Sequence, residues 1–365
     1  MRLLTINFGG LGDEVLFLPT LSTIKTAHPD WEITLLTEPR SRAIAQLSRT
    51  IDKLVVFDIK KSPLKPADYL QLISLLRAGK YDIVMASGSS AKVCLLLALS
   101  GIPQRIGFDS GALSRFLLSR AIPLKKAQYA AFMYHDLVHG LDLNAETQLP
   151  KIDLEPAALS SMQKFLEQEQ SRQKKQGQRK GVVIHPGMSR LALEKGIIKT
   201  WAAENWCKLI AQLLQQNCQV VLCGGPDDAE TIQEIVGGLA SLSLEAPGLF
   251  INASGKTASI QELVALMSLS DLVVCVDSAP MHIAVALPKN LVALFGPTDP
   301  KRLLPQDERF LSIRDASADP NHDVFIDGNK ARGSADSASK PGNIDIPLDR
   351  VMALAKTQLD KVVKS

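Results

Sequence analysis

Val273-Val-Cys-Val-Asp-Ser-Ala-Pro-Met-His-Ile-Ala-Val-Ala-Leu287 is the stretch that decides the fold of this chain. The apolar run from Leu272 to Val276 predicts a buried strand that ends at Asp277, and the residues after it have the pattern of a helix. A second apolar run, 291–295, leads directly into Gly296-Pro-Thr-Asp-Pro300. Two neighbouring strands therefore bring polar side chains to the edge at which open α/β sheets bind their ligands, namely Asp277, Ser278, His282 and Thr298.

The same alternation of strands and helices runs through both halves of the chain. In the first half, strand patterns alternate with helical ones: strands at 3–8, 32–37, 53–57, 82–86 and 104–107, and helices at 13–27, 41–47, 67–78, 90–99 and 127–141. The alternation restarts at Gly181, with strands at 181–185, 219–223, 249–252, 272–276 and 291–295. This spacing is typical of βαβ units and a parallel sheet. The sequence therefore predicts an α/β protein with two Rossmann-like, doubly wound domains that face each other across a cleft.

Composition sets the expected domain limits. A charged segment, 171–180, separates the two alternations, so we place the N-terminal domain at 1–175 and the C-terminal domain at 176–346. Residues 315–345 are rich in Asp, Ser, Gly and Asn and predict a long loop. The remaining residues, 347–365, carry a final helical pattern.

The overall balance of residues excludes several classes of protein. The chain has 365 residues and a net charge of +3 with dispersed basic residues, so we do not expect a nucleic-acid partner. Its five cysteines form no CxxC pair, which is typical of reduced core thiols in a cytoplasmic protein. The N-terminal apolar run ends too soon, at Gly9, to be a signal peptide. No apolar stretch is long enough to span a bilayer, although the protein could touch a membrane surface.

The turn Gly9-Gly-Leu-Gly12 after the first strand is followed by Asp13, for which two interpretations stay open. One is a simple N-cap of the first helix, and the other is a general base whose carboxylate points into the cleft. The turn is not the dinucleotide fingerprint, because Val15 stands where a third glycine is needed. Glu38 at the end of the second strand has the position of a ribose-binding acid, so a nicotinamide oxidoreductase stays an alternative.

In the second half, each candidate residue again has a structural and a functional interpretation. Lys199 is either a surface lysine or a group that neutralises a diphosphate. The helix start after Asp277 offers free N–H groups to a phosphate, and Asp277 itself would orient amides or Ser278. Three acids could cap a helix or hold a ribose diol: Asp227, Asp228 and Glu230.

No constellation in the sequence predicts a metal site. His135-x-x-x-His139 lacks a third ligand, so we interpret the two histidines as structural. The chain also lacks an Asp-x-Asp pair that could hold Mg²⁺ for a nucleotide-sugar diphosphate.

Several motifs together carry a resemblance. In order, they are Gly12-Asp13 before an apolar helix, His185-Pro-Gly187, Lys199-x-Trp201, Gly224-Gly-Pro226, Asp277-Ser-Ala-Pro-Met-His282 and Leu294-Phe-Gly-Pro-Thr-Asp-Pro300. From residue 1 to about 305 the chain resembles glycosyltransferase family 9, the family of the lipopolysaccharide heptosyltransferases. It departs from the family pattern at Ala279, where glycine is usual.

The resemblance implies a GT-B fold, with acceptor bound by the N-terminal domain, donor by the C-terminal domain, and a C-terminal helix that returns to the first domain. It implies inverting, metal-independent transfer without a cofactor, and Asp13 as the base. On the donor side we place His185, Lys199, Asp228, Asp277, Ser278, Ala279, Met281, His282 and Thr298. On the acceptor side we place Gly10, Gly12, Arg105 and Arg115.

The resemblance also suggests partners: an ADP-heptose-like nucleotide sugar and a glycolipid or oligosaccharide acceptor at the cytoplasmic face of the inner membrane, where the protein would make a peripheral contact. The locally basic segment 105–126 could meet acidic groups of such an acceptor, or could be ordinary solvated surface. Two rivals stay open beside the oxidoreductase. One is a nucleotide-sugar epimerase of GT-B fold, and the other is a nucleotide-sugar-binding protein without turnover.

Overall fold

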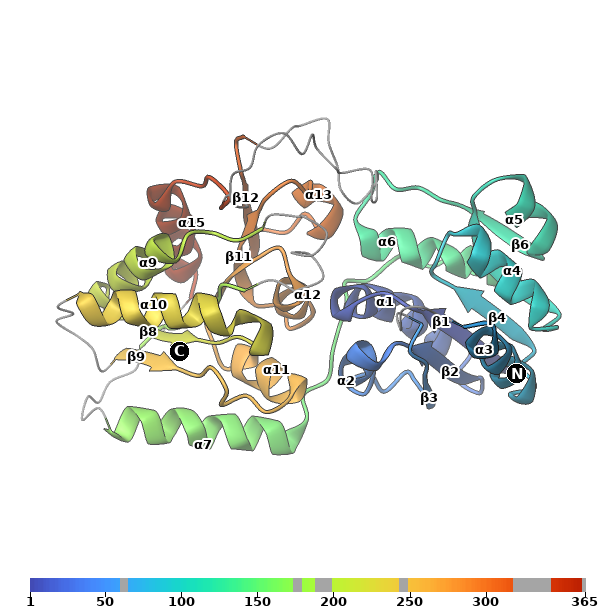
Figure 1. Ribbon diagram of the computed structural model, residues 1–365, viewed down its shortest axis with the longest axis horizontal. Coiled ribbons are helices and arrows are strands. Elements are labelled where there is room, and N and C mark those ends of the chain that lie inside the picture. The colour runs from blue at the N-terminus through green and yellow to red at the C-terminus, as the bar shows by residue number, and fades with distance from the viewer. Residues whose placement is uncertain (60–64, 173–178, 188–198, 243–248, 318–342, 363–365) are drawn as a thin grey trace. The chain divides into compact units, whose positions relative to one another are not determined.

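A computed structural model describes residues 1–59, 65–172, 179–187, 199–242, 249–317 and 343–362. It divides into two compact units, Met1–Asp153 and Leu154–Ser365, each built around one six-stranded sheet with helices on both faces (Figure 1). Every strand pair in both sheets is parallel. The two doubly wound α/β units confirm the predicted fold class.

The first sheet has the strand order β3-β2-β1-β4-β5-β6. Its strands are β1 (Arg2–Asn7), β2 (Glu32–Thr37), β3 (Lys53–Val56), β4 (Ile83–Ala86), β5 (Gln104–Asp109) and β6 (Arg120–Pro123). The helices between and after them are α1 (Leu11–Ala27), η1 (Pro39–Ser41), α2 (Arg42–Ala45), α3 (Pro66–Ala78), α4 (Ala91–Leu99), α5 (Ala112–Leu117), α6 (Ala130–His135) and η2 (Asp136–Leu141). The strand order reverses between β1 and β4, and such a switch point opens a crevice at the carboxyl ends of the strands.

The second sheet repeats this topology in the order β12-β11-β10-β7-β8-β9. Its strands are β7 (Gly181–His185), β8 (Gln219–Leu222), β9 (Phe250–Asn252), β10 (Leu272–Val276), β11 (Asn290–Phe295) and β12 (Phe310–Arg314). Its helices are α7 (Pro156–Arg172), α9 (Ala203–Gln215), η3 (Pro226–Asp228), α10 (Ala229–Ser241), α11 (Ile260–Ser268), α12 (Ala279–Ala286), α13 (Pro300–Leu303) and α15 (Leu348–Asp360). Here the switch point lies between β7 and β10, and the carboxyl end of β10 lies beside His185, which pairs with Cys275.

Several short elements of the described chain were absent from the sequence expectations, among them α5, η3, α13 and the strands β6 and β12. Both strands lie at the edge of their sheet and are only partly buried. An edge strand needs a weaker apolar pattern because one of its sides meets solvent. The predicted helix at 127–141 is shorter, since α6 ends at His135 and the chain continues as the 3₁₀ helix η2. Most of the predicted loop at 315–345 lies outside the described residues.

The domain limits differ from the expected ones. The units divide after Asp153 rather than near 175, because α7 packs against α11 of the second unit, where Ser161 Oγ donates to Glu262 Oε1 over 3.1 Å. The final helix was expected to return to the first domain. Instead, α15 packs against α9, β10 and β11, and its buried side chains join the core of the second unit.

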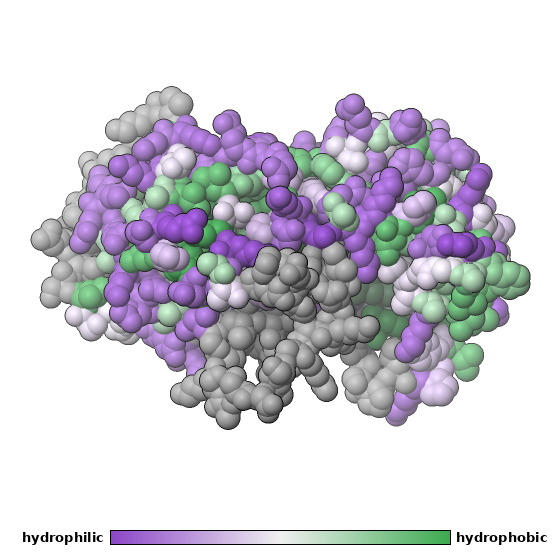
Figure 2. Space-filling view, turned by 90° about the horizontal axis from the view of Figure 1, so that it is seen from above, coloured by the Kyte–Doolittle hydropathy of each residue, from purple (hydrophilic) through white to green (hydrophobic). Residues whose placement is uncertain are grey.

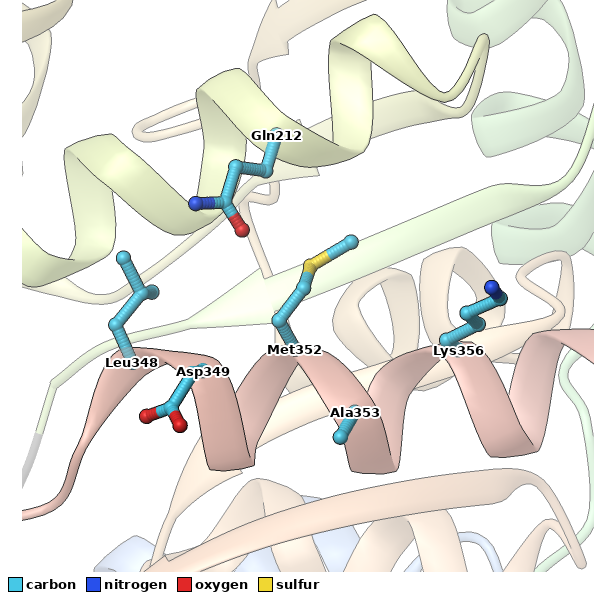
Figure 3. Close-up of a pocket in the computed structure, with 6 residues that line it drawn as sticks. All are labelled: Gln212, Leu348, Asp349, Met352, Ala353 and Lys356. Atoms are coloured by element: carbon cyan, nitrogen blue, oxygen red, sulfur yellow. The ribbon is translucent and has the colours of Figure 1, made fainter.

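α15 and α9 lie side by side, and a shallow depression of about 530 Å³ is lined by residues of both helices (Figure 3). Met352 and Leu348 of α15 and Gln212 of α9 line it. Val351 and Ala355, which precede and follow Met352 in the same helix, are fully buried. The helix is therefore held by its apolar side rather than by polar contacts alone.

A substitution pair tests this assignment. Ala355→Asp should place an unpaired charge in the core and lower the free energy of unfolding of the second unit by about 3–5 kcal/mol. Ala353→Asp on the exposed side of the same helix should cost less than about 1 kcal/mol. Hydrogen exchange would locate the effect, with lost protection in β7, β10 and β11. Equal loss in β1 and β4 would contradict the assignment of α15.

Candidate functional site

In the first unit, the glycine turn after β1 leads into α1, and Asp13 is the third residue of that helix. One carboxylate oxygen, Oδ2, accepts a hydrogen bond from the backbone N–H of Gly10 over 2.8 Å. A Cβ on Gly9 would lie 2.2 Å from the Cβ of Asp13, so only glycine fits there. Asp13 is therefore not the N-cap that one interpretation predicted: Gly10 is the N-cap, and Asp13 accepts its N–H from the third helical position.

The second oxygen of Asp13 has a distant partner. The phenol of Tyr134, on α6, donates to Asp13 Oδ1 over 3.0 Å. Burial, and then the negative charge of Asp13, raises the pKa of Tyr134 well above its ordinary value. The phenol therefore keeps its proton and always acts as donor toward the carboxylate. Two donors from different parts of the unit fix the carboxylate plane, and each oxygen retains a lone pair.

Asn7, the last residue of β1, holds the glycine turn in place through hydrogen bonds of its side chain. Its side chain donates from Nδ2 to the backbone oxygen of Asp13 over 3.2 Å. Its Oδ1 accepts from the N–H of Gly9 over 3.2 Å and from Ser87 Oγ over 2.9 Å. Because Asn7 is only 1% exposed, these bonds form away from water and hold both sides of the turn to the end of β4.

A pocket of about 210 Å³ opens at this switch point. Asp13 and Tyr134 lie on its wall together with Asn7, Ser87 and Gly88. Its remaining wall is mostly apolar: Ile6, Phe8, Gly9, Ala86 and Val93. A carboxylate fixed at the wall of a pocket of this size is a suitable acceptor for the proton of a bound hydroxyl group.

Directly behind Asp13, Glu14 is fully buried and accepts a hydrogen bond from Thr37 Oγ1 over 2.6 Å. Burial raises the pKa of Glu14 to about 8, and the nearby charges of Asp13 and Glu38 act in the same direction. At neutral pH this carboxyl group is therefore protonated and adds no negative charge beside Asp13.

In the second unit, β10 delivers Asp277 to the start of α12. Lys199 Nζ donates to Asp277 Oδ2 over 2.6 Å, and the side chains are 16% and 2% exposed. Lys199 balances the charge of Asp277, so the carboxylate does not stand at the start of α12 as an unpaired negative charge. In the first turn of α12, Pro280 has no N–H and the N–H of Met281 donates to the carbonyl of Ser278 over 3.0 Å, which leaves the N–H of Ala279 for an anion.

The neighbours of this ion pair have more local roles. Ser278 is the N-cap of α12, and its hydroxyl donates to the carbonyl of Val276 over 3.2 Å. Ala279 is the first helical residue and is half-buried, while Met281 and His282 are buried within the helix. Thr298, after β11, is 3% exposed, and its hydroxyl has no hydrogen-bond partner among the described residues.

A second aspartate cap occurs at the end of β8. Asp228 Oδ2 accepts from the N–H of Gly225 over 2.8 Å, the same arrangement as Asp13 with Gly10. A Cβ on Gly187 would lie 1.8 Å from Asp228 Oδ1, which explains the glycine in His185-Pro-Gly187. His185 Nε2 lies 3.6 Å from Asp228 Oδ2, and burial lowers the pKa of His185 and raises that of Asp228. Asp228 is buried, whereas Asp227 and Glu230 are exposed.

The structure separates the arginines from the Asp13 pocket. The guanidinium of Arg105 donates to the carbonyls of Ile102, Pro103 and Leu117. Arg115 Nε bonds Asp109 Oδ2 over 2.7 Å and lowers the pKa of that carboxyl group. Neither arginine lines the pocket, in contrast to Gly9 at its wall.

Two other polar candidates have structural partners. The nitrogens of His135 bond the hydroxyls of Thr23 and Thr147, over 2.9 and 2.8 Å, which confirms a structural histidine. Glu38 is buried and pairs with Arg40 over 3.1 Å. In the described part of the chain, no group of three or more His, Cys, Asp or Glu side chains could hold a metal ion.

Sequence reasoning missed Tyr134, Ser87 and Glu14. Ser87 directly follows a predicted strand, so the rule about carboxyl ends of strands could have found it. Tyr134 comes from a helix 121 residues away from Asp13, and no local pattern marks it.

Two doubly wound units in tandem, each with polar groups at its switch point, have the GT-B fold. The family model for glycosyltransferase family 9 (heptosyltransferase) matches residues 69–323. This chain therefore belongs to glycosyltransferase family 9, and it is a glycosyltransferase. Membership removes the support for a nicotinamide oxidoreductase.

Individual relatives agree with the family. The chain is 28% identical over 321 residues to lipopolysaccharide heptosyltransferase 2 of Salmonella typhimurium, covering 86% of this chain and 88% of the relative. It is 29% identical to lipopolysaccharide heptosyltransferase 3 of Escherichia coli, covering 79% and 80%. Among solved structures, it matches a family 9 glycosyltransferase of Veillonella parvula with a TM-score of 0.76, at 22% identity over 99% and 97% of the two chains. It also matches the E. coli ADP-heptose lps heptosyltransferase II, with a TM-score of 0.73 at 23% identity over 99% of each chain.

The buried acid behind Asp13 gives a pH prediction. Because its folded pKa is about 8 and its ordinary value 4.5, Glu14 keeps a proton in the folded chain that the unfolded chain releases. Stability should therefore fall as pH rises from about 4.5 to 8, by up to about 4 kcal/mol from this group. Glu14→Gln keeps an acceptor for Thr37 without titrating. Its melting temperature should change less than that of the wild type across this window.

Glu204→Gln is the matched control, since Glu204 is exposed on α9 and pairs only with Lys208 in the i,i+4 position. Its profile should follow the wild type. Parallel profiles for Glu14→Gln and the wild type would show that Glu14 is already ionised in the folded chain.

Proposed function

We propose that this chain transfers a heptose or related sugar, with inversion, from an ADP-heptose-like donor to a hydroxyl group of a lipopolysaccharide-core-like acceptor. The observation that carries the proposal is the fixed carboxylate of Asp13 on the wall of a pocket. Names of the relatives support the sugar and the acceptor, since both refer to lipopolysaccharide heptosyltransferases. The absence of an Asp-x-Asp pair from the sequence supports transfer without a metal.

In this mechanism, Asp13 accepts the proton of the acceptor hydroxyl while that oxygen attacks the anomeric carbon of the donor. The bond from the anomeric carbon to the diphosphate oxygen breaks on the opposite face, so configuration inverts. Tyr134 and Gly10 keep the carboxylate oriented. Fixed orientation lowers the barrier because little reorganisation remains at the moment of reaction.

We assign the donor diphosphate to the start of α12. The N–H of Ala279, Lys199 and the hydroxyl of Thr298, which has no hydrogen-bond partner within the described ranges, would stabilise the charge of the leaving diphosphate. Ser278, Ala279, Met281 and His282 would form the wall around it. Asp228 is buried and its carboxylate accepts the N–H of Gly225. We therefore propose that Asp228 and His185 shape the donor site.

The acceptor would enter beside Gly10 and Gly12, with Arg105 and Arg115 further from the pocket. We also propose a peripheral contact of the chain with the cytoplasmic face of the inner membrane. In the described residues, no helix is both long enough and apolar enough to cross a membrane.

Asp13→Asn should lower kcat by about 10²- to 10⁴-fold, because the amide cannot accept the proton. It keeps the size of the side chain and an acceptor for the bond from Gly10. Affinity for ADP-heptose, followed by the rise in melting temperature, should stay within about twofold of the wild type. Incubation of the wild type with donor alone also distinguishes a transferase from the rival epimerase, since an epimerase would change the sugar in the absence of an acceptor. If the Asp13→Asn variant transfers sugar at the wild-type rate, Asp13 is not the base.

The ion pair of Lys199 with Asp277 gives a second prediction. Lys199→Met should weaken donor binding by about 10- to 100-fold and should also destabilise the chain, because it leaves a buried carboxylate unpaired. The double variant Lys199→Met with Asp277→Asn should regain stability without regaining donor affinity. Calorimetric titration with ADP-heptose, beside unfolding in urea, measures both. If the double variant binds donor like the wild type, Lys199 only anchors Asp277.

A further inference from the structure

The exposed large hydrophobic side chains of the described chain are not evenly distributed. Of ten such residues, four lie on the short helices α4 and α5. These helices pack against each other in the first unit. The four side chains, with exposed fractions of 50%, 43%, 51% and 83%, are Leu95, Leu99, Leu113 and Phe116. Their density on two neighbouring helices distinguishes them from scattered surface residues.

The spacing puts these residues on the outer faces of the two helices. On α4, Cys94 and Leu97 are buried in the core, while Leu95 and Leu99 are four residues apart on the exposed side. On α5, Leu113 and Phe116 are three residues apart on one side. Hydrophobic atoms gather at the right-hand end of Figure 2, the end at which Figure 1 shows α4 and α5. We call these four side chains the α4–α5 face.

The segment that carries this face has a one-sided charge. Residues 91–126 contain six basic residues and one acidic residue, whereas the whole chain has 41 basic and 38 acidic residues. Lys92 and Lys125 are exposed. Arg115 and Arg120 pair with Asp109 and Asp142, but these pairs are open to solvent and a competing anion could replace them at low cost.

We propose that the α4–α5 face docks on an anionic lipid bilayer. Leucine and phenylalanine side chains would enter the boundary between headgroups and acyl chains, and the surrounding lysines and arginines would meet lipid phosphates. A second copy of this chain fits less well, since a symmetric interface would bring the same basic residues of two copies together. Apolar and basic contacts together give two signals, which is what stable anchoring at a membrane surface takes.

The position of α4 connects this face with the pocket of Asp13. Val93 of the same helix lines that pocket, two residues before Leu95. A helix seated on lipid would therefore hold the pocket near the headgroups, where the sugar of a glycolipid is found. This advantage rests on the proposed function, whereas lipid binding by the face does not.

Vesicle binding tests the proposal with the full chain and without donor or acceptor. The protein should cosediment with vesicles of phosphatidylethanolamine and phosphatidylglycerol, and about tenfold less with phosphatidylcholine alone. Leu113→Ser with Phe116→Ser should lower binding by about tenfold or more. Lys92→Glu with Lys125→Glu should lower it only for the anionic vesicles. Leu242→Ser is the control, because Leu242 is similarly exposed, at 41%, on the second unit.

A fluorescent label would show which surface makes the contact. All five native cysteines are buried, so a thiol introduced by Leu113→Cys can be labelled selectively. An environment-sensitive dye there should shift to the blue on anionic vesicles, whereas the dye on Leu242→Cys should not. The proposal is wrong if the wild type does not bind, if the serine variants bind equally, or if those variants instead convert a dimer to a monomer.

Transfer to a water-soluble oligosaccharide separates this outcome from the proposed function. The Leu113→Ser and Phe116→Ser double variant should keep wild-type activity on that acceptor. Vesicle binding without any sugar transfer would leave the docking face intact and overturn the proposed activity instead.

Discussion

The hydrogen bond from a glycine N–H to the carboxylate of an aspartate three residues later is the contact on which both sites depend. It occurs as Gly10 with Asp13 in the first unit and as Gly225 with Asp228 in the second. In each case the carboxylate fills space that a side chain would otherwise take, so Gly9 and Gly187 have no room for a Cβ. Gly9 and Gly187 are thus explained by packing against an acid, not by a need for unusual backbone angles.

What differs between the two turns is the second partner of the aspartate. Asp13 meets a phenol that cannot give up its proton at neutral pH, and its carboxylate stands at a pocket wall. Asp228 meets His185 in a buried environment that favours the uncharged form of both groups. The same glycine–aspartate turn therefore holds an acid suited to accepting a proton in the first unit. In the second unit it holds an acid suited to shaping a loop.

Much of this architecture could be predicted because long apolar runs such as β1, β10 and β11 are buried on both faces and stand out in the sequence. The edge strand β12 and the short helix α5 could not, since half-exposed elements carry weak patterns. Asp277 and Thr298 were found because they closely follow strands, and Asp13 because it follows the glycine turn after β1. Tyr134 was missed, and Lys199 was identified but not as the partner of Asp277. These two residues lie 121 and 78 residues from the acids they contact, and single-sequence patterns do not report such distances.

The unequal sequence separation of the contacts to Asp13 has a consequence for folding. Gly10 and Asn7 are three and six residues away, so their bonds can form as soon as β1 and α1 meet. Tyr134 has to arrive across 121 residues, after β5 and β6 have joined the sheet, and contacts of such high sequence separation form late. During folding of the first unit, Gly10 and Asn7 would thus hold Asp13 in place before Tyr134 orients its carboxylate. The complete site would form at the end of that unit's folding rather than at its beginning.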